Sequence, residues 1–140
     1  MSTAGYSGTP LPRKLGIRAG SRLLVVAPPA DFDALLGELP HDVEWVAPPA
    51  AAVDVAVLFV LDSASLHGQF TPLAELLQPA GGLWVAWPKR SSGIETDLGE
   101  GAVRELGLAA GLVDNKVCAI DATWSGLRFV RRLRDRPARL

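Results

Sequence analysis

An uninterrupted apolar run, VAVLFVL at residues 55–61, constrains the fold of this chain more than any other feature. Every position is apolar, whereas a strand with one face in water alternates apolar and polar residues. A strand formed here would therefore be buried on both faces, as the central strands of parallel sheets are when helices cover them. A second run, LLVV at residues 23–26, predicts another strand of the same kind.

Strand and helix patterns alternate along the rest of the chain. The predicted strands are 22–27, 43–46, 55–61, 83–87, 116–121 and 127–132, with the segment ATWSG joining the last two as a hairpin. The predicted helices are 11–15, 32–38, 63–77 in two pieces, and 97–111. Strands that alternate with helices favour right-handed crossovers. We therefore predict an α/β domain with a shortened Rossmann-like, class I methyltransferase-like sheet, mainly parallel, with a C-terminal antiparallel hairpin and helices on both faces.

Acidic residues are expected to cap two of these helices. Asp31 precedes the helix at 32–38, and Asp97 forms a capping-box pattern with Glu100 three residues later. Both helices would then begin with a side-chain oxygen that accepts a backbone N–H.

Length and cysteine content favour a single intracellular domain. We expect an N-terminal extension at 1–20 that packs on or near the domain, one α/β domain at 21–133, and a basic tail at 134–140. Cys118 is the only cysteine, so no intramolecular disulfide can form, which favours a reducing compartment. No apolar stretch is long enough to span a bilayer. We therefore expect a cytoplasmic protein without membrane contact.

Three stretches together resemble a known family. They are GYSGTPLPRKLGI at 5–17, LWVAWPKRSSGIETDL at 83–98 and GLVDNKVCAIDATWSGLRFVRR at 111–132. The combination is similar to the DUF3052 family of small bacterial proteins, which are common in actinobacteria. The family has no assigned activity, so the resemblance supports the fold and a cytoplasmic location and implies no reaction.

The turn after the first strand is unsuited to a nucleotide cofactor. Pro28 and Pro29 lie where such folds have a glycine-rich loop, and proline lacks the N–H that a phosphate needs. The second strand runs into Ala47-Pro48-Pro49 and lacks the acidic residue that holds a ribose. We therefore expect no S-adenosylmethionine and no other cofactor. No cluster of His, Cys or carboxylates has metal-ligand spacing, so no metal is expected either.

The best candidate for a ligand site is the loop WPKRSSG at 87–93, because ligands of open parallel sheets bind beyond the carboxyl ends of the strands. A small anion such as a phosphate or carboxylate could bind there, near the start of the helix expected at Asp97. The alternative is a solvated loop that binds nothing, with Asp97 and Glu100 already neutralising the helix end. The candidate ligand-binding residues are Lys89, Arg90, Ser91, Ser92 and Asp62.

No catalytic residue is predicted. Asp62 and His67 could form an acid–base pair, but a lone histidine near a helix start is more often a surface residue. Cys118 lies in a predicted strand with no group placed to lower its pKa, so we expect an inert thiol.

The hairpin tip, DATWSG at 121–126, is the candidate partner surface. Thr123, Trp124 and Ser125 could face a protein partner, or Trp124 could fold back and anchor the hairpin with its indole N–H bonded to an acceptor. Trp84 and Trp87 are expected in the core.

Charge is distributed unevenly along the chain. Residues 128–140 hold six arginines and one aspartate, although the whole chain carries a formal charge of −1, so the remainder is acidic. That acidic body, without a basic helix or stacking aromatics, argues against a nucleic-acid partner. A charged edge strand would account for Arg128, Arg131 and Arg132 without any partner.

These features favour a binding module for a partner protein or small anionic ligand, without S-adenosylmethionine-dependent activity. The alternative is a divergent methyltransferase-like enzyme with an atypical cofactor site. A third hypothesis is a homodimer with Trp124 in the interface of the closing hairpin.

Overall fold

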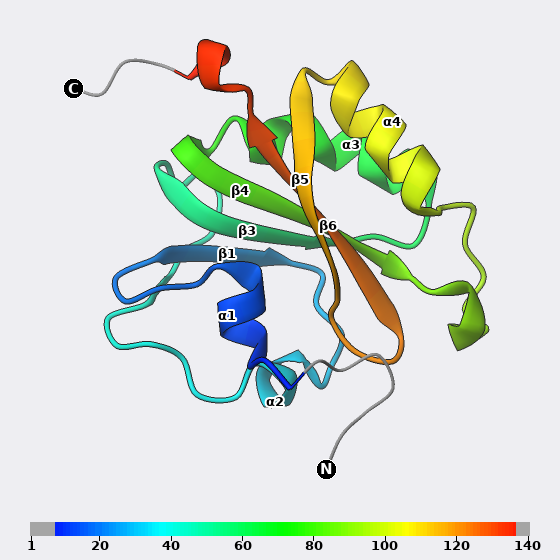
Figure 1. Ribbon diagram of the computed structural model, residues 1–140, viewed down its shortest axis with the longest axis horizontal. Helices are drawn as coiled ribbons and strands as arrows, with labels where there is room; N and C mark the ends of the chain where they lie inside the picture. The colour runs from blue at the N-terminus through cyan, green and yellow to red at the C-terminus, as the bar shows by residue number, and fades with distance from the viewer. Residues whose placement is uncertain (1–7, 137–140) are drawn as a thin grey trace.

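A computed structural model describes residues 8–136 and contains a six-stranded mixed sheet in the order β2-β1-β3-β4-β6-β5 (Figure 1). β1 to β4 run parallel, and β6 runs antiparallel to both of its neighbours, β4 and β5. The predicted Rossmann-like sheet with a closing antiparallel hairpin is confirmed. The strands are β1 (Arg22–Val26), β2 (Glu44–Trp45), β3 (Val53–Phe59), β4 (Leu77–Pro88), β5 (Leu112–Ala119) and β6 (Trp124–Arg131).

Helices cover both faces of this sheet, as predicted (Figure 1). α1 (Leu11–Leu15) and α2 (Phe32–Leu36) pack on one face, while α3 (Ser63–Ala74) and α4 (Glu100–Ala109) pack on the other. Short 3₁₀ helices, η1 (Arg90–Ser92) and η2 (Leu133–Asp135), follow β4 and β6. Within residues 8–136, no helix has the length and apolar character that a membrane crossing requires.

Each face of the sheet has its own hydrophobic core. On the α1 face, the fully buried Trp84 donates its indole N–H to the carbonyl of Leu15 at 2.9 Å, which fastens the end of α1 to β4. On the opposite face, Phe70 of α3 meets Phe129 of β6 edge to face, with ring centroids 5.2 Å apart. Trp84 and Trp87 are both buried, so their predicted place in the core is confirmed.

Two element boundaries differ from the prediction for steric reasons. β4 begins at Leu77 and runs through QPAGG, which we had expected to be a turn. A Cβ at Gly81 would lie 2.6 Å from the carbonyl oxygen of Val53, so glycine permits the close approach of β3 and β4 there. α3 is one continuous helix with Pro72 inside it, and not two pieces.

The predicted caps are wrong at both helices. α4 begins after Gly99, which has no side chain to cap it, and the Asp97 carboxylate accepts the backbone N–H of Ser63 at 2.8 Å. Asp31 precedes α2 but accepts no capping hydrogen bond. Asp97 thus connects the loop after β4 to the start of α3.

The arginine-rich strand is not an edge strand, which corrects the prediction made from its charge. β6 lies between β4 and β5, so β5 forms that edge of the sheet. The guanidinium of Arg131 donates to the carbonyls of Ala74, Leu77 and Gln78, each at 3.0 Å. Arg131 therefore satisfies carbonyl groups where α3 ends and β4 begins.

Candidate functional site

Aromatic side chains occupy the place where a ligand of this fold is expected. The strand order reverses between β1 and β3, and ligands of open α/β sheets bind beyond the carboxyl ends at such a point. Here Phe32, two per cent exposed, packs edge to face on Phe59 at the end of β3, with centroids 5.1 Å apart. Trp124 also packs edge to face on Phe59, with ring centroids 5.0 Å apart. Neither of the two main cavities that residues 8–136 line includes any of these three side chains.

The predicted ligand-binding residues Lys89, Arg90, Ser91 and Ser92 lie together in one loop. Several of their polar groups already form hydrogen bonds with protein groups. Lys89 donates its backbone N–H to the carbonyl of Thr123 at 2.7 Å. The Ser92 hydroxyl donates to the Lys89 carbonyl at 2.6 Å and accepts the N–H of Ile94 at 3.1 Å. Arg90 and Ser91 are exposed on η1. An anion at this loop would find the cations of Lys89 and Arg90, but not a free Ser92 hydroxyl.

Asp62 is a helix cap in this structure. Its carboxylate accepts the N–H of Ser65 at 2.8 Å, and this backbone hydrogen bond lowers the pKa of Asp62. Asp97 accepts the neighbouring N–H of Ser63, so two carboxylates meet at the start of α3. His67 is exposed one turn along the helix, and within residues 8–136 no bond joins it to Asp62. The carboxylates make this position unfavourable for an anion.

Trp124 is buried at the hairpin, which favours the anchoring role over contact with a partner. The side chain is nine per cent exposed and packs on Phe59, and its contact with a partner stays a prediction. The hairpin turn is fixed by Asp121, whose carboxylate accepts the N–H groups of Thr123 and Trp124, both at 2.8 Å. Thr123 and Ser125 are half-buried, and their contact with a partner stays a prediction.

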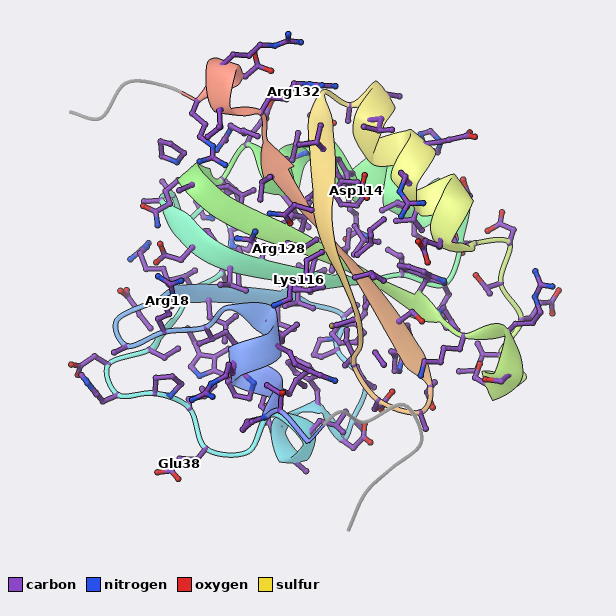
Figure 2. The ribbon with its side chains drawn as sticks, in the orientation of Figure 1. Arg18, Glu38, Asp114, Lys116, Arg128 and Arg132 are labelled. Carbon is purple, nitrogen blue, oxygen red and sulfur yellow. The ribbon has the colours of Figure 1, made fainter. Side chains whose placement is uncertain are left out.

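A cavity of about 1030 Å³ lies elsewhere, at the amino ends of the parallel strands. α1 and the residues after it form one wall, and the starts of β3 and β4 form the floor. β5 and β6 contribute Lys116 and Arg128, which Figure 2 shows close together near the middle of the sheet. Arg18, in the segment after α1, is labelled to the left of that helix. Sequence reasoning had placed the site at the opposite ends of the strands.

Positive side chains dominate the lining of this cavity. Five cations line it, against two carboxylates, and one of these, Asp54, already accepts the backbone N–H of Arg22 at 2.7 Å. The second carboxylate, Glu38, lies on the loop that leads to β2 and is far from Arg128 in Figure 2. The cations are Arg13, Lys14, Arg18, Lys116 and Arg128.

A β-bulge places two of these cations side by side. Side chains alternate between the faces of a regular strand, so Asp114 and Lys116 would share one face. The register of β5 shifts between them, which pairs Asp114 with Phe129 and Lys116 with Arg128. Asp114 consequently lies on the α4 face, where its carboxylate binds Arg104 at 3.0 Å, while Lys116 lies beside Arg128 on the α1 face (Figure 2).

Arg128 lies close against the sheet because Gly82, beneath it on β4, has no side chain. A Cβ at Gly82 would overlap the guanidinium of Arg128, so glycine provides the space in which this group lies across β4. Burial lowers the pKa of Arg128, and the neighbouring charges of Arg136 and Arg18 lower it further. The guanidinium is thus half-buried among other cations.

Cys118 lies on β5 near the same cations. Cys118 is partly buried on β5, and burial raises the pKa of its thiol, although Lys14, Lys116 and Lys89 oppose that rise. The balance supports the predicted inert thiol, because a thiolate is the nucleophilic form.

Comparison with known proteins identifies the fold. No protein-family model and no curated protein matches the chain. A SAM-dependent methyltransferase from Aquifex aeolicus is 17% identical with a TM-score of 0.55, over 84% of this chain and 85% of that one. A TehB-like SAM-dependent methyltransferase from Corynebacterium glutamicum is 11% identical with a TM-score of 0.57, over 92% and 91%. The [4+2]-cyclase SpnF is 11% identical with a TM-score of 0.52, over 86% and 79%.

These similarities establish a methyltransferase-like Rossmann fold, as the order of the predicted elements indicated. At such identities they show the fold alone, and the same fold is shared by a cyclase. What the chain does must therefore be argued from its own residues.

Proposed function

We propose that this chain is a binding module that takes a small anionic ligand or a partner protein and does not use S-adenosylmethionine. The observation that carries the proposal is the packing at the strand-order reversal. Phe32 lies on Phe59 and Phe59 on Trp124, so buried rings occupy the space beside the carboxyl end of β3. An adenosyl group placed there would have to displace this part of the core.

The turn after β1 supports the same proposal. Ala27 takes a left-handed conformation with φ 56°, and Pro28 and Pro29 follow it before α2 begins. The two prolines offer no N–H to a ligand, and their rings occupy space that glycines would leave open. An anion is better accommodated by the cations at the opposite end of the strands.

Calorimetry with S-adenosylmethionine and, separately, S-adenosylhomocysteine tests the proposal. The full chain is expected to release no heat of binding with either compound. The same solutions titrated into an established methyltransferase serve as the positive control. A dissociation constant in the micromolar range for either compound would contradict the proposal.

A divergent methyltransferase-like enzyme with an atypical cofactor site is the second candidate. The comparisons favour it more directly than they favour a binding role, because S-adenosylmethionine-dependent methyltransferases recur among the similar structures. Micromolar binding of the cofactor would establish this candidate, and Pro28→Gly with Pro29→Gly would then be expected to tighten it by supplying N–H donors.

The sequence resemblance extends the proposal to relatives. We propose that the chain is a DUF3052-type protein that acts in the cytoplasm, on the basis of the stretches at 5–17, 83–98 and 111–132. A screen of other DUF3052 proteins in the same calorimetric assay checks whether they too lack cofactor binding.

A further inference from the structure

The cross-strand pair of Lys116 and Arg128 is unfavourable unless a third group neutralises it. The two residues are directly opposite on β5 and β6, and like charges in such positions destabilise a sheet. Within residues 8–136, neither side chain forms an ion pair. The bonded partner of the Arg128 guanidinium is the amide oxygen of Asn115, at 3.3 Å.

The surrounding elements increase this positive charge. Arg18, which follows α1, and Arg136, which follows η2, both act on Arg128 through their charges. The bulge in β5 has meanwhile directed the nearest acidic side chain of that strand, Asp114, to the opposite face, where it pairs with Arg104. Segments distant in sequence thus concentrate cations around one guanidinium.

The position of Arg128 is fixed by the backbone beneath it. Gly82 leaves room for the guanidinium to lie flat on β4, and the backbone of Gly82 is paired with Val55 of β3. Val55 and Ile17 give the same cavity apolar lining. A charged group and a carbon skeleton could therefore be held together in this cavity.

We propose that this cavity binds a small organic molecule through a phosphate group placed between Lys116 and Arg128. A phosphate carries a charge of about −1.5 to −2 near neutral pH, so a single group offsets both cations, whereas one carboxylate offsets only one. The planar guanidinium donates two parallel hydrogen bonds to phosphate oxygens, and the lysine ammonium adds a point charge. The cavity volume suits a small molecule that is larger than phosphate itself.

This inference rests on the proposed function in one respect, namely that the domain binds an anionic ligand. It moves the site from the loop at 89–92 to the amino ends of the strands and names phosphate as the group recognised.

Calorimetric titration of the full chain with inorganic pyrophosphate at low ionic strength tests the inference. Arg128→Gln and Lys116→Gln are each expected to weaken pyrophosphate binding by about tenfold or more, because each removes a charge-assisted contact. Arg90→Gln removes the same charge from the loop that the sequence favoured, so it should change the affinity by less than about twofold. Citrate, which carries carboxylates and no phosphate, should bind the wild type more weakly than pyrophosphate does.

Three results would overturn the inference: no pyrophosphate binding to the wild type, equal affinities for wild type and Lys116→Gln, or a greater loss with Arg90→Gln than with Arg128→Gln. Lys116 is exposed, so its substitution keeps the test valid even if Arg128→Gln fails to fold. A wild type that binds neither pyrophosphate nor S-adenosylmethionine overturns this inference alone. One that binds S-adenosylmethionine overturns the proposed function.

Discussion

Lys116 shows how one additional residue in a strand changes the charge of a whole face. Without the register shift after Asp114, Lys116 would lie on the face where Asp114 and Arg104 already form an ion pair. With the shift, Lys116 lies beside Arg128 and no carboxylate accompanies it on β5. The positive cavity is therefore a product of backbone register as much as of amino-acid composition.

Replacing Lys116 by Gln should stabilise the fold in the absence of a ligand. The change removes repulsion from Arg128, so we expect the free energy of unfolding to rise by about 0.2–1 kcal/mol at low ionic strength. Urea unfolding measures this gain, and it should shrink in high salt because the repulsion is then screened. Arg90→Gln is the matched control and should leave stability nearly unchanged, since Arg90 is exposed on η1. A loss of stability in Lys116→Gln would show that the lysine makes a favourable contact instead.

At the scale of elements, α4 docks on β6 through a glycine. A Cβ at Gly107 would overlap the ring of Phe129, while a Cβ at Gly101 in the same helix would meet no atom within 4 Å. Both glycines lie in the same helix, but only Gly107 is crowded. Comparing substitutions at the two positions therefore distinguishes the effect of packing on stability from the effect of helix propensity.

Alanine at these two glycines should have effects of opposite sign. Gly107→Ala forces Phe129 or the helix to move and should cost about 1–3 kcal/mol of unfolding free energy. Gly101→Ala should stabilise the protein by up to about 1 kcal/mol, because alanine is the better helix former. Chemical denaturation of the two variants beside the wild type measures both effects. Effects of the same sign would mean that α4 does not lie this close to β6.

At the scale of the whole molecule, the architecture could be predicted from the sequence, because a long apolar run can be buried in only a few ways. The run at 55–61 does contribute the central strand β3, and the alternating pattern correctly predicted a mixed sheet with helices on both faces. The ends of helices and strands were less predictable where one contact between distant residues determines them. Gly81 extends β4 by its approach to Val53, and Asp97 caps no part of α4, which begins after Gly99, but binds the start of α3.

The candidate site was harder to predict than the fold. The loop at 89–92 was chosen from the general rule that ligands bind at carboxyl ends, whereas the cations of the cavity come from α1 and the residues after it, β5 and β6. Lys116 and Arg128 are twelve positions apart, and only their register makes them neighbours. A strand pattern with period two places Lys116 on the same face as Asp114. No residue in the segment DNKV at 114–117 indicates the bulge that moves Lys116 to the opposite face.

Substitution of Trp124 tests whether the closing hairpin packs in the core or forms an interface between two copies of the chain. Trp124→Ala should lower the free energy of unfolding by about 3–5 kcal/mol, because it removes a buried ring that packs on Phe59. Light scattering should give the same molar mass for the variant and the wild type. Trp45→Ala is the control, since Trp45 is 51% exposed and should cost far less. A small loss of stability with a halved mass would instead place Trp124 between two copies of the chain.

The three carbonyls that Arg131 binds belong to residues 74, 77 and 78, which a ribosome makes more than fifty positions earlier. β4 likewise has β3 on one side at once, but it receives β6 on the other side only after α4 and β5 have been made. A growing chain therefore carries an incomplete sheet, with one side of β4 open, until β6 emerges. Until that moment the open side of β4 presents unpaired backbone N–H and C=O groups, with which a strand of another chain could pair.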